Sequence, residues 1–113
     1  MSPALPNAGS QSEADCGAVE RAFGVLGRKW TGLIIRQLID GPRHFCDLER
    51  GVRAVTARML TERMKELEAA GIVTRTVDTG TPVRTSYELT EKGRALIPVM
   101  RGIEQWALAW PDT

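Results

Sequence analysis

The sequence lacks several features that would place it in whole classes of protein. It has two cysteines and one histidine among 113 residues, which are too few for a secreted disulfide framework or a common zinc site. No apolar run is long enough to span a bilayer, and residues 1–13 have neither the basic start nor the hydrophobic stretch of a secretory signal. We therefore expect a cytoplasmic protein with no membrane partner, no metal and reduced thiols.

The net charge is also small, and few side chains are suited to catalysis. The formal net charge is +1, so bulk electrostatics do not indicate a nucleic-acid binder, and any argument for DNA must rest on local charge. With one histidine, no phosphate-binding loop and no metal-ligand spacing, the sequence offers no acid, base or nucleophile constellation. We therefore expect neither an enzyme nor a cofactor. Apolar and charged fractions of 42% and 26% are ordinary for one globular domain.

Hydrophobic periodicity and turn residues predict a mainly α-helical fold with a small β-hairpin, an α+β arrangement. Residues 1–13, rich in Ser, Pro, Asn and Gly, are expected to form a disordered arm before a single domain at residues 14–113. The expected helices span residues 16–26, 29–40, 46–51, 57–70 and 91–110. The expected strands span residues 72–77 and 83–89. Thr56 and Thr90 are suitable N-caps, and Pro98 predicts a kink in the last helix.

This order of elements, three helices and then a two-stranded ribbon, is that of the winged helix-turn-helix. In helix-turn-helix proteins the second helix of the pair enters the major groove, so residues 57–70 are the expected recognition helix. Arg50, Arg53 and Arg58 lie close together with no acid between them. The helix dipole favours anions at a helix start, so it does not explain these cations, whereas a phosphate partner does. A solvated charged face is the alternative interpretation.

Different side chains are expected to make different contacts with double-stranded DNA. Arg58 is expected to read a base edge, because arginine can bind guanine through two donors, and Lys65 to contact phosphate. Glu62 either accepts from cytosine or pairs with a neighbouring cation along the helix, and we favour the pairing. Arginines of the hairpin are expected to lie along the duplex backbone or to reach a minor groove, and a solvent-facing position is the alternative. The expected DNA-binding residues are Arg50, Arg53, Thr56, Ala57, Arg58, Thr61, Lys65, Arg75 and Arg84.

Six short motifs stand in register along the chain, each weak alone. They are Cys16-Gly-Ala-Val-Glu20, Gly27-Arg-Lys-Trp-Thr31, Gly41-Pro-Arg-His-Phe45, Met59-Leu-Thr-Glu-Arg-Met-Lys-Glu-Leu-Glu68, Pro82-Val-Arg84 and Tyr87-Glu-Leu-Thr-Glu-Lys-Gly93. Together they resemble the HxlR-type winged-helix regulators, relatives of the MarR group, over nearly all of the chain after the arm. The chain departs from that family at Arg53-Ala54, where the family has a Pro-Gly-like turn, so operator details are not carried over.

The resemblance implies a transcriptional regulator, with repression as the expected mode, that binds a near-palindromic operator as a homodimer. It also implies that the terminal helices form much of the dimer contact. The residues agree, because the last helix carries more apolar surface than a small monomer should leave in water. Two-fold symmetry would place the recognition helices roughly 34–36 Å apart. The expected interface residues are Val19, Phe23, Met100, Ile103, Trp106, Ala107 and Trp110.

Cys16 is the candidate sensor, because in several members of the resembled family a cysteine at the matching position senses electrophiles or oxidants. Here it follows Asp15 at the start of an expected helix, where the dipole stabilises thiolate. Its oxidation would shift the spacing between recognition helices. The alternative is a small buried hydrophobic residue. Cys46 and His44 are expected to be structural.

Two other functions remain as alternatives. Trp30, Trp106 and Trp110 could line a pocket for a small apolar effector at the dimer contact, although core and interface packing is the favoured interpretation. A winged helix used as a protein-interaction module would instead show acidic or apolar residues on the recognition face, where Arg58 and Lys65 stand.

Overall fold

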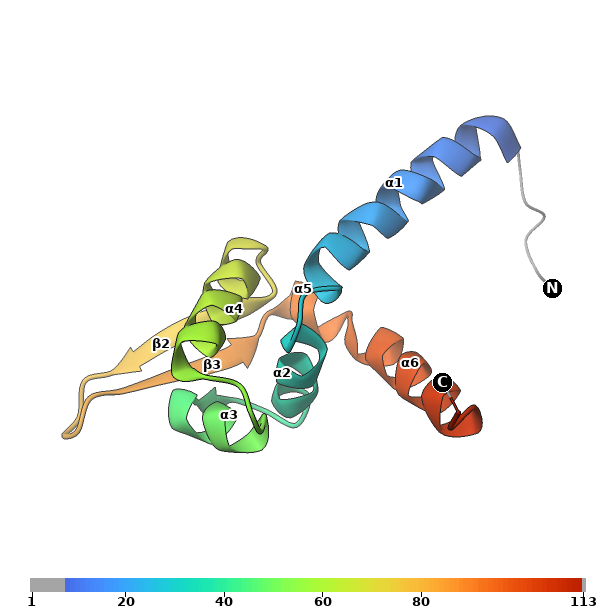
Figure 1. Cartoon of the computed structure of the whole chain (residues 1–113). Coiled ribbons are helices and arrows are strands. Elements are labelled where there is room, and N and C mark those ends of the chain that lie inside the picture. Colours follow the sequence, from blue (N-terminus) through green and yellow to red (C-terminus); the bar gives the residue numbers. More distant parts are fainter. Residues whose placement is uncertain (1–7, 113) are drawn as a thin grey trace.

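Residues 8–112 are described in the computed structural model of the chain. Their elements, in chain order, are α1 (Ala8–Leu26), α2 (Thr31–Leu38), β1 (Arg43–His44), α3 (Phe45–Gly51), α4 (Ala57–Ala69), β2 (Val73–Asp78), β3 (Arg84–Leu89), α5 (Glu91–Arg94) and α6 (Ile97–Ala109). Figure 1 shows a body built from α2, α3, α4 and the sheet, from which α1, α6 and the β2–β3 hairpin project in different directions. This confirms the predicted helix-dominated fold. No helix of residues 8–112 has the length and apolar character needed to cross a membrane.

The core lies where α2, α3 and α4 meet the sheet. The central helix α2 contributes Ile34 and Ile35, which are completely buried, as its largely apolar circumference predicts. Its first residue, Thr31, is also buried. The core residues are Ile34, Ile35, Leu38, Leu48, Val52, Leu60, Met64, Leu67, Ile72, Val73, Tyr87 and Leu89. Trp30 packs against this cluster, which supports packing rather than ligand lining for that side chain.

The sheet has one strand more than the predicted hairpin. Its order is β1-β3-β2, and all pairs are antiparallel. The short β1 lies beside β3, with Arg43 opposite Tyr87. In β2 only Val73 is buried, and the remaining residues are exposed. The hairpin therefore stands away from the body as a wing.

The first helix begins at Ala8 rather than at Cys16. The predicted start at residue 16 is therefore wrong, and so is disorder for residues 8–13; residues 1–7 of the predicted arm lie outside the described residues. The segment that follows Pro6 contains Ala, Gln and Glu and no further proline, and these residues favour helix. The prediction of disorder gave the glycine and the serines of this segment too much weight.

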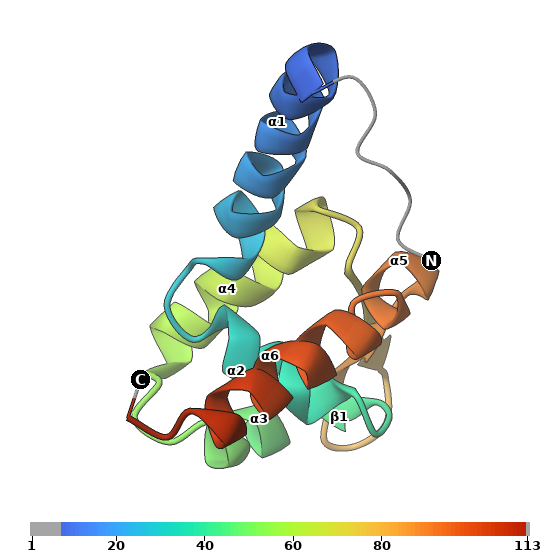
Figure 2. The same cartoon turned by 90° about the vertical axis from the view of Figure 1, so that its right-hand side faces the viewer.

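The predicted last helix is two helices. Helix α5 is capped as predicted, because the Thr90 hydroxyl accepts a hydrogen bond from the Gly93 amide at 3.0 Å. The chain then turns, and Pro98 lies in the first turn of α6, where its missing N–H breaks no helical bond. Figure 2 shows α6 lying across α2, and the Nε of Arg36 lies 3.4 Å from the Oε2 of Glu104.

Candidate nucleic-acid interface

A tight turn between α3 and α4 sets the direction in which α4 begins. Val52 is buried at the end of α3, and the Val55 amide donates to its carbonyl at 3.4 Å. Between them Ala54 has φ +72°, a left-handed conformation that costs a residue with a Cβ roughly 1–2 kcal/mol. The Thr56 hydroxyl then accepts from the Met59 amide at 3.1 Å, which confirms the predicted N-cap. The chain therefore enters α4 in one defined direction.

Helix α4 has an apolar inner face and a charged outer face. Leu60, Met64 and Leu67 are buried, whereas the Arg58 side chain is 89% exposed. The Nε of Arg58 lies 3.9 Å from a carboxylate oxygen of Glu62, which confirms the favoured pairing along the helix. An exposed pair of this kind contributes little stability, so either charge can turn to an external partner.

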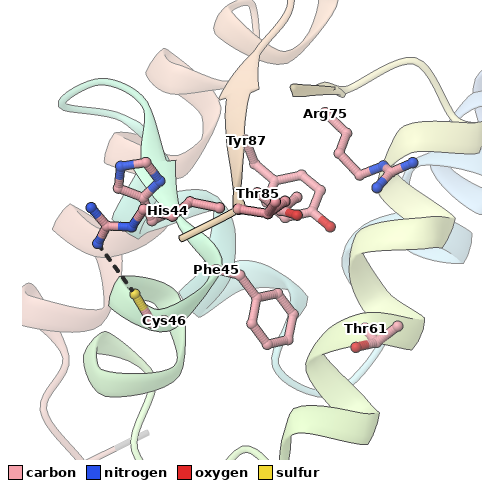
Figure 3. A pocket seen from close by; sticks show the side chains of 9 residues that line it. His44, Phe45, Cys46, Thr61, Arg75, Thr85 and Tyr87 are labelled. Carbon is pink, nitrogen blue, oxygen red and sulfur yellow. Dashed lines mark hydrogen bonds between the residues drawn. The ribbon is translucent and has the colours of Figure 1, made fainter. Parts of the chain in front are cut away.

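A hollow of about 370 Å³ lies between α4 and the wing. Figure 3 shows Thr61 on one side of it, Phe45 and Cys46 on another, and Thr85 and Tyr87 on the strand between. Its lining residues are His44, Phe45, Cys46, Thr61, Arg75, Val83, Arg84, Thr85 and Tyr87. The structure therefore brings together three of the predicted DNA-binding residues, one from the helix and two from the wing.

The sequence did not predict the part of this hollow formed by β1 and the start of α3. Arg84 Nη2 donates a hydrogen bond to Cys46 Sγ at 3.9 Å, and the Nδ1 atom of His44 is buried without a hydrogen-bond partner. Burial raises the pKa of Tyr87, and the positive charge of Arg75 partly opposes this. In the sequence, only the short extended segment before α3 could have indicated that His44 and Cys46 lie beside the wing.

The other predicted DNA-binding residues lie outside the hollow, on the outer surface of the α3–α4 unit. Arg53 is exposed in the turn, and Arg50 is paired with Asp47 on α3. Desolvation pushes the pKa of Asp47 upward, but the hydrogen bond and charge of Arg50 outweigh it and leave that pKa below its ordinary value. The remaining members of this outer set are Thr56, Ala57, Arg58 and Lys65, all exposed.

A second set of exposed side chains, on the separately projecting helices α1 and α6, forms an apolar surface in two parts. Val19 and Phe23 on α1 and Ile103, Trp106 and Trp110 at the end of α6 are 48–64% exposed. Of the other predicted interface residues, Ala107 is exposed and Met100 packs partly against the core. Large apolar side chains that a helix leaves exposed in this way mark an interaction surface on each helix.

Cys16 is exposed on α1. It lines a shallow groove of about 550 Å³ together with Asp15, Val19, Glu20 and Phe23. Because α1 begins at Ala8, Cys16 lies within the helix, and the predicted stabilisation of its thiolate by a helix N-terminus is wrong. The exposure that a sensor requires is present.

Comparison with known sequences places residues 25–113 within a family described as HxlR-like helix-turn-helix. An HTH-type transcriptional regulator of Bacillus subtilis (strain 168), YvaP, is 43% identical over 91% of this chain and 94% of its own length. The transcriptional regulator YodB of the same organism is 46% identical over 81% of this chain and 82% of its own length.

Solved structures of two regulators have the same fold. The reduced form of YodB has a TM-score of 0.72 at 45% identity, covering 80% of this chain and 89% of YodB. The redox regulator HypR in its reduced form has a TM-score of 0.80 at 39% identity, covering 84% of this chain and 94% of HypR. YodB has also been solved after diamide treatment and with quinone bound.

Proposed function

The chain belongs to the HxlR-like helix-turn-helix family and is a transcriptional regulator, and from this premise we propose that it represses transcription as a cytoplasmic homodimer on a near-palindromic operator. The observation that carries the proposal is the two-faced α4. Its inner face is fixed in the core, and its outer face presents Arg58, 89% exposed, beside the capped start of the helix. This is the arrangement that allows early residues of a recognition helix to reach base edges.

The outer face of α4 and the wing make different contacts with DNA. Arg58 reads a base edge by two donors, and its loose contact with Glu62 gives way when a guanine is present. Lys65 contacts phosphate. Across the hollow, Arg75 and Arg84 contact the neighbouring stretch of backbone, which fixes the register of α4 without reading sequence.

The partner that covers the apolar surface is a second copy of the chain. Both α1 and α6 expose aromatic and aliphatic side chains, and HTH repressors bind paired half-sites as dimers. The predicted interface residues supply such a contact on both helices. A symmetric dimer repeats α4 at the second half-site.

Cys16 makes the regulator responsive to oxidants or electrophiles. Two observations support this role: the thiol is exposed in a groove on the apolar surface, and HypR is a redox regulator, while YodB has been solved with quinone bound. Modification of Cys16 would change how α1 packs in the dimer, and so the distance between the recognition helices.

Two apolar observations support a second candidate, a regulator that binds a small apolar effector. Trp106 on α6 and Trp110 just after it are exposed, and a largely apolar hollow of about 400 Å³ lies between α1 and residues of the 70–72 and 92–96 segments. Use of the fold as a protein-interaction module is less favoured, because the outer face of α4 carries cations.

The DNA proposal is tested by mobility shift on genomic fragments that the purified protein selects. Arg58→Ala should weaken specific binding by roughly 1–3 kcal/mol and relax base preference at one position. Arg101→Ala, which removes an exposed arginine from α6, is the matched control and should bind as wild type. Equal affinity and base preference in Arg58→Ala would remove that residue from the reading role.

The sensor proposal is tested separately, with diamide or a quinone titrated into the same assay. Wild type should release DNA, and Cys16→Ser should retain it. An equal response from both proteins would rule out Cys16 as the switch.

A further inference from the structure

A buried arginine connects the recognition helix to the end of α1. Arg63 is 5% exposed and is the charged residue of the core within residues 15–112. Its Nε donates to the carbonyl of Lys29 at 2.9 Å, and its Nη1 lies 3.0 Å from the Oε2 of Glu66. The same Oε2 accepts from the Nη2 of Arg28 at 3.1 Å. One carboxylate oxygen on α4 therefore joins an arginine of its own helix to an arginine just beyond α1.

Val25 and Leu26 at the end of α1 pack against the core, and polar side-chain contacts span the space beside them. A hollow of about 270 Å³ lies between α1 and α4. It is lined by Gly24, Val25, Arg28, Thr31, Glu66 and Leu67. Two of the residues that border it, Arg28 and Glu66, are the ones that form the ion pair across it. The angle between α1 and α4 therefore depends on these polar contacts as well as on the packing of Val25 and Leu26.

The connection from α1 to α2 is too constrained to absorb a movement of α1. The Gly27 amide donates to the Phe23 carbonyl at 2.8 Å, and the Thr31 amide donates to the Arg28 carbonyl at 3.2 Å. Between these bonds Trp30 has φ +79°, which a bulky residue rarely adopts and which persists only when its surroundings impose it. A tilt of α1 therefore displaces Arg28 and the Lys29 carbonyl together.

Stability alone does not call for an arginine at position 63. An apolar side chain of similar volume often stabilises a core as well as a buried ion pair does. What arginine adds is a planar fork whose donors point in fixed directions. Here the fork contacts the α1–α2 connection through Nε and Glu66 through Nη1, so it fixes direction as well as distance.

We propose that Arg28, Glu66 and Arg63 are positioning residues that set the orientation of α4 relative to α1, and thereby the separation of the operator half-sites that the dimer accepts. This inference rests on the proposed function, in which α1 belongs to the dimer contact and α4 to the DNA contact. When modification of Cys16 tilts α1, the same three residues transmit that tilt to the recognition helix.

The test is selection from a DNA library in which two half-sites are separated by spacers that differ by single base pairs. Wild type should prefer one spacer strongly. In Arg28→Ala and Glu66→Gln that preference should fall by about 2- to 30-fold, the range for residues that modulate coupling between sites. Affinity for an isolated half-site should stay unchanged, because the outer face of α4 is intact. Arg28→Lys should restore part of the preference, and Arg101→Ala should match wild type.

Arg63→Lys keeps the charge and loses the fork, so it should broaden the spacer preference even if Arg63→Ala fails to fold. An unchanged spacer preference in folded Arg28→Ala and Glu66→Gln would overturn the inference and leave the proposed function standing. A proportional loss of affinity for isolated and paired half-sites would also overturn it, since that is the effect of a purely structural role. A wild-type protein with no preference for paired half-sites would instead contradict the proposed function.

Discussion

Helices α4 and α6 have the same length of 13 residues, yet they meet the rest of the protein in opposite ways. Helix α4 buries an apolar stripe and leaves its charged face exposed. Helix α6 is rich in apolar residues and has no buried one. The difference shows that apolar content does not identify the element that forms the core of a subunit. In α4 the apolar residues form part of the core, and in α6 most of them remain exposed.

The largest expected effect is a loss of stability on changing the buried face of α4. Leu60 is completely buried on α4, so Leu60→Ala should lower the free energy of unfolding by about 2–5 kcal/mol. The loss should be similar at every protein concentration, because the cavity lies within one subunit. Urea unfolding followed by circular dichroism measures it. A loss below that of an ordinary surface substitution would mean that α4 is not anchored as described.

A smaller, concentration-dependent effect should come from the exposed side. Trp106 on α6 is 54% exposed, and Trp106→Ala should weaken dimerisation by roughly 2 kcal/mol, as expected for a tryptophan at the centre of an interface. Sedimentation at several concentrations gives the dissociation constant. Leu108→Ala, at a residue 75% exposed and outside the predicted interface, is the control. Equal dissociation constants for both variants would place the dimer contact elsewhere.

The turn before α4 sharpens the comparison further. Ala54 has φ +72°, and glycine adopts this conformation without the steric cost of a Cβ. Ala54→Gly should therefore stabilise the protein by about 1 kcal/mol or less, because the more flexible unfolded chain offsets part of the gain. Thermal unfolding measures the change. Destabilisation would indicate that the turn is not left-handed at this residue.

The smallest effect concerns Asp47, in the first turn of α3. The folded protein holds its pKa below the ordinary value, so the carboxylate stabilises the fold at neutral pH, and this contribution is lost as the pH falls through the folded pKa. Asp47→Asn should therefore be slightly less stable than wild type near pH 7. The difference should close below about pH 4. A difference that persists undiminished in acid would contradict a role for the charge.

Features set by local chemistry were predicted well from the sequence. The caps at Thr56 and Thr90 and the buried stripe of α4 depend on residues three or four positions apart, so they can be found without knowing the fold. The start of α1 was wrong because glycine and serine suggest a disordered arm, whereas alanine, glutamine and glutamate favour helix, and composition does not decide between them.

Features that depend on distant segments were missed. Cys46 lies beside Arg84 because β1 pairs with β3, and the sequence of a short extended segment does not show which strand it pairs with. Arg63 resembles one more cation of a charged helix until its contact with Lys29, in a different part of the chain, is known. The single long C-terminal helix was wrong for a related reason, since proline is compatible both with a kink and with a new first turn.

The proposed regulation depends most on α4 lying in a DNA groove and being repeated by a second subunit. Hydroxyl-radical footprinting of the protein on a selected operator tests this directly. Two equivalent protected patches are expected on one side of the duplex, separated by about one helical turn, or roughly 34–36 Å. A single protected patch, or protection that is unchanged in position and strength by Arg58→Ala, would contradict it.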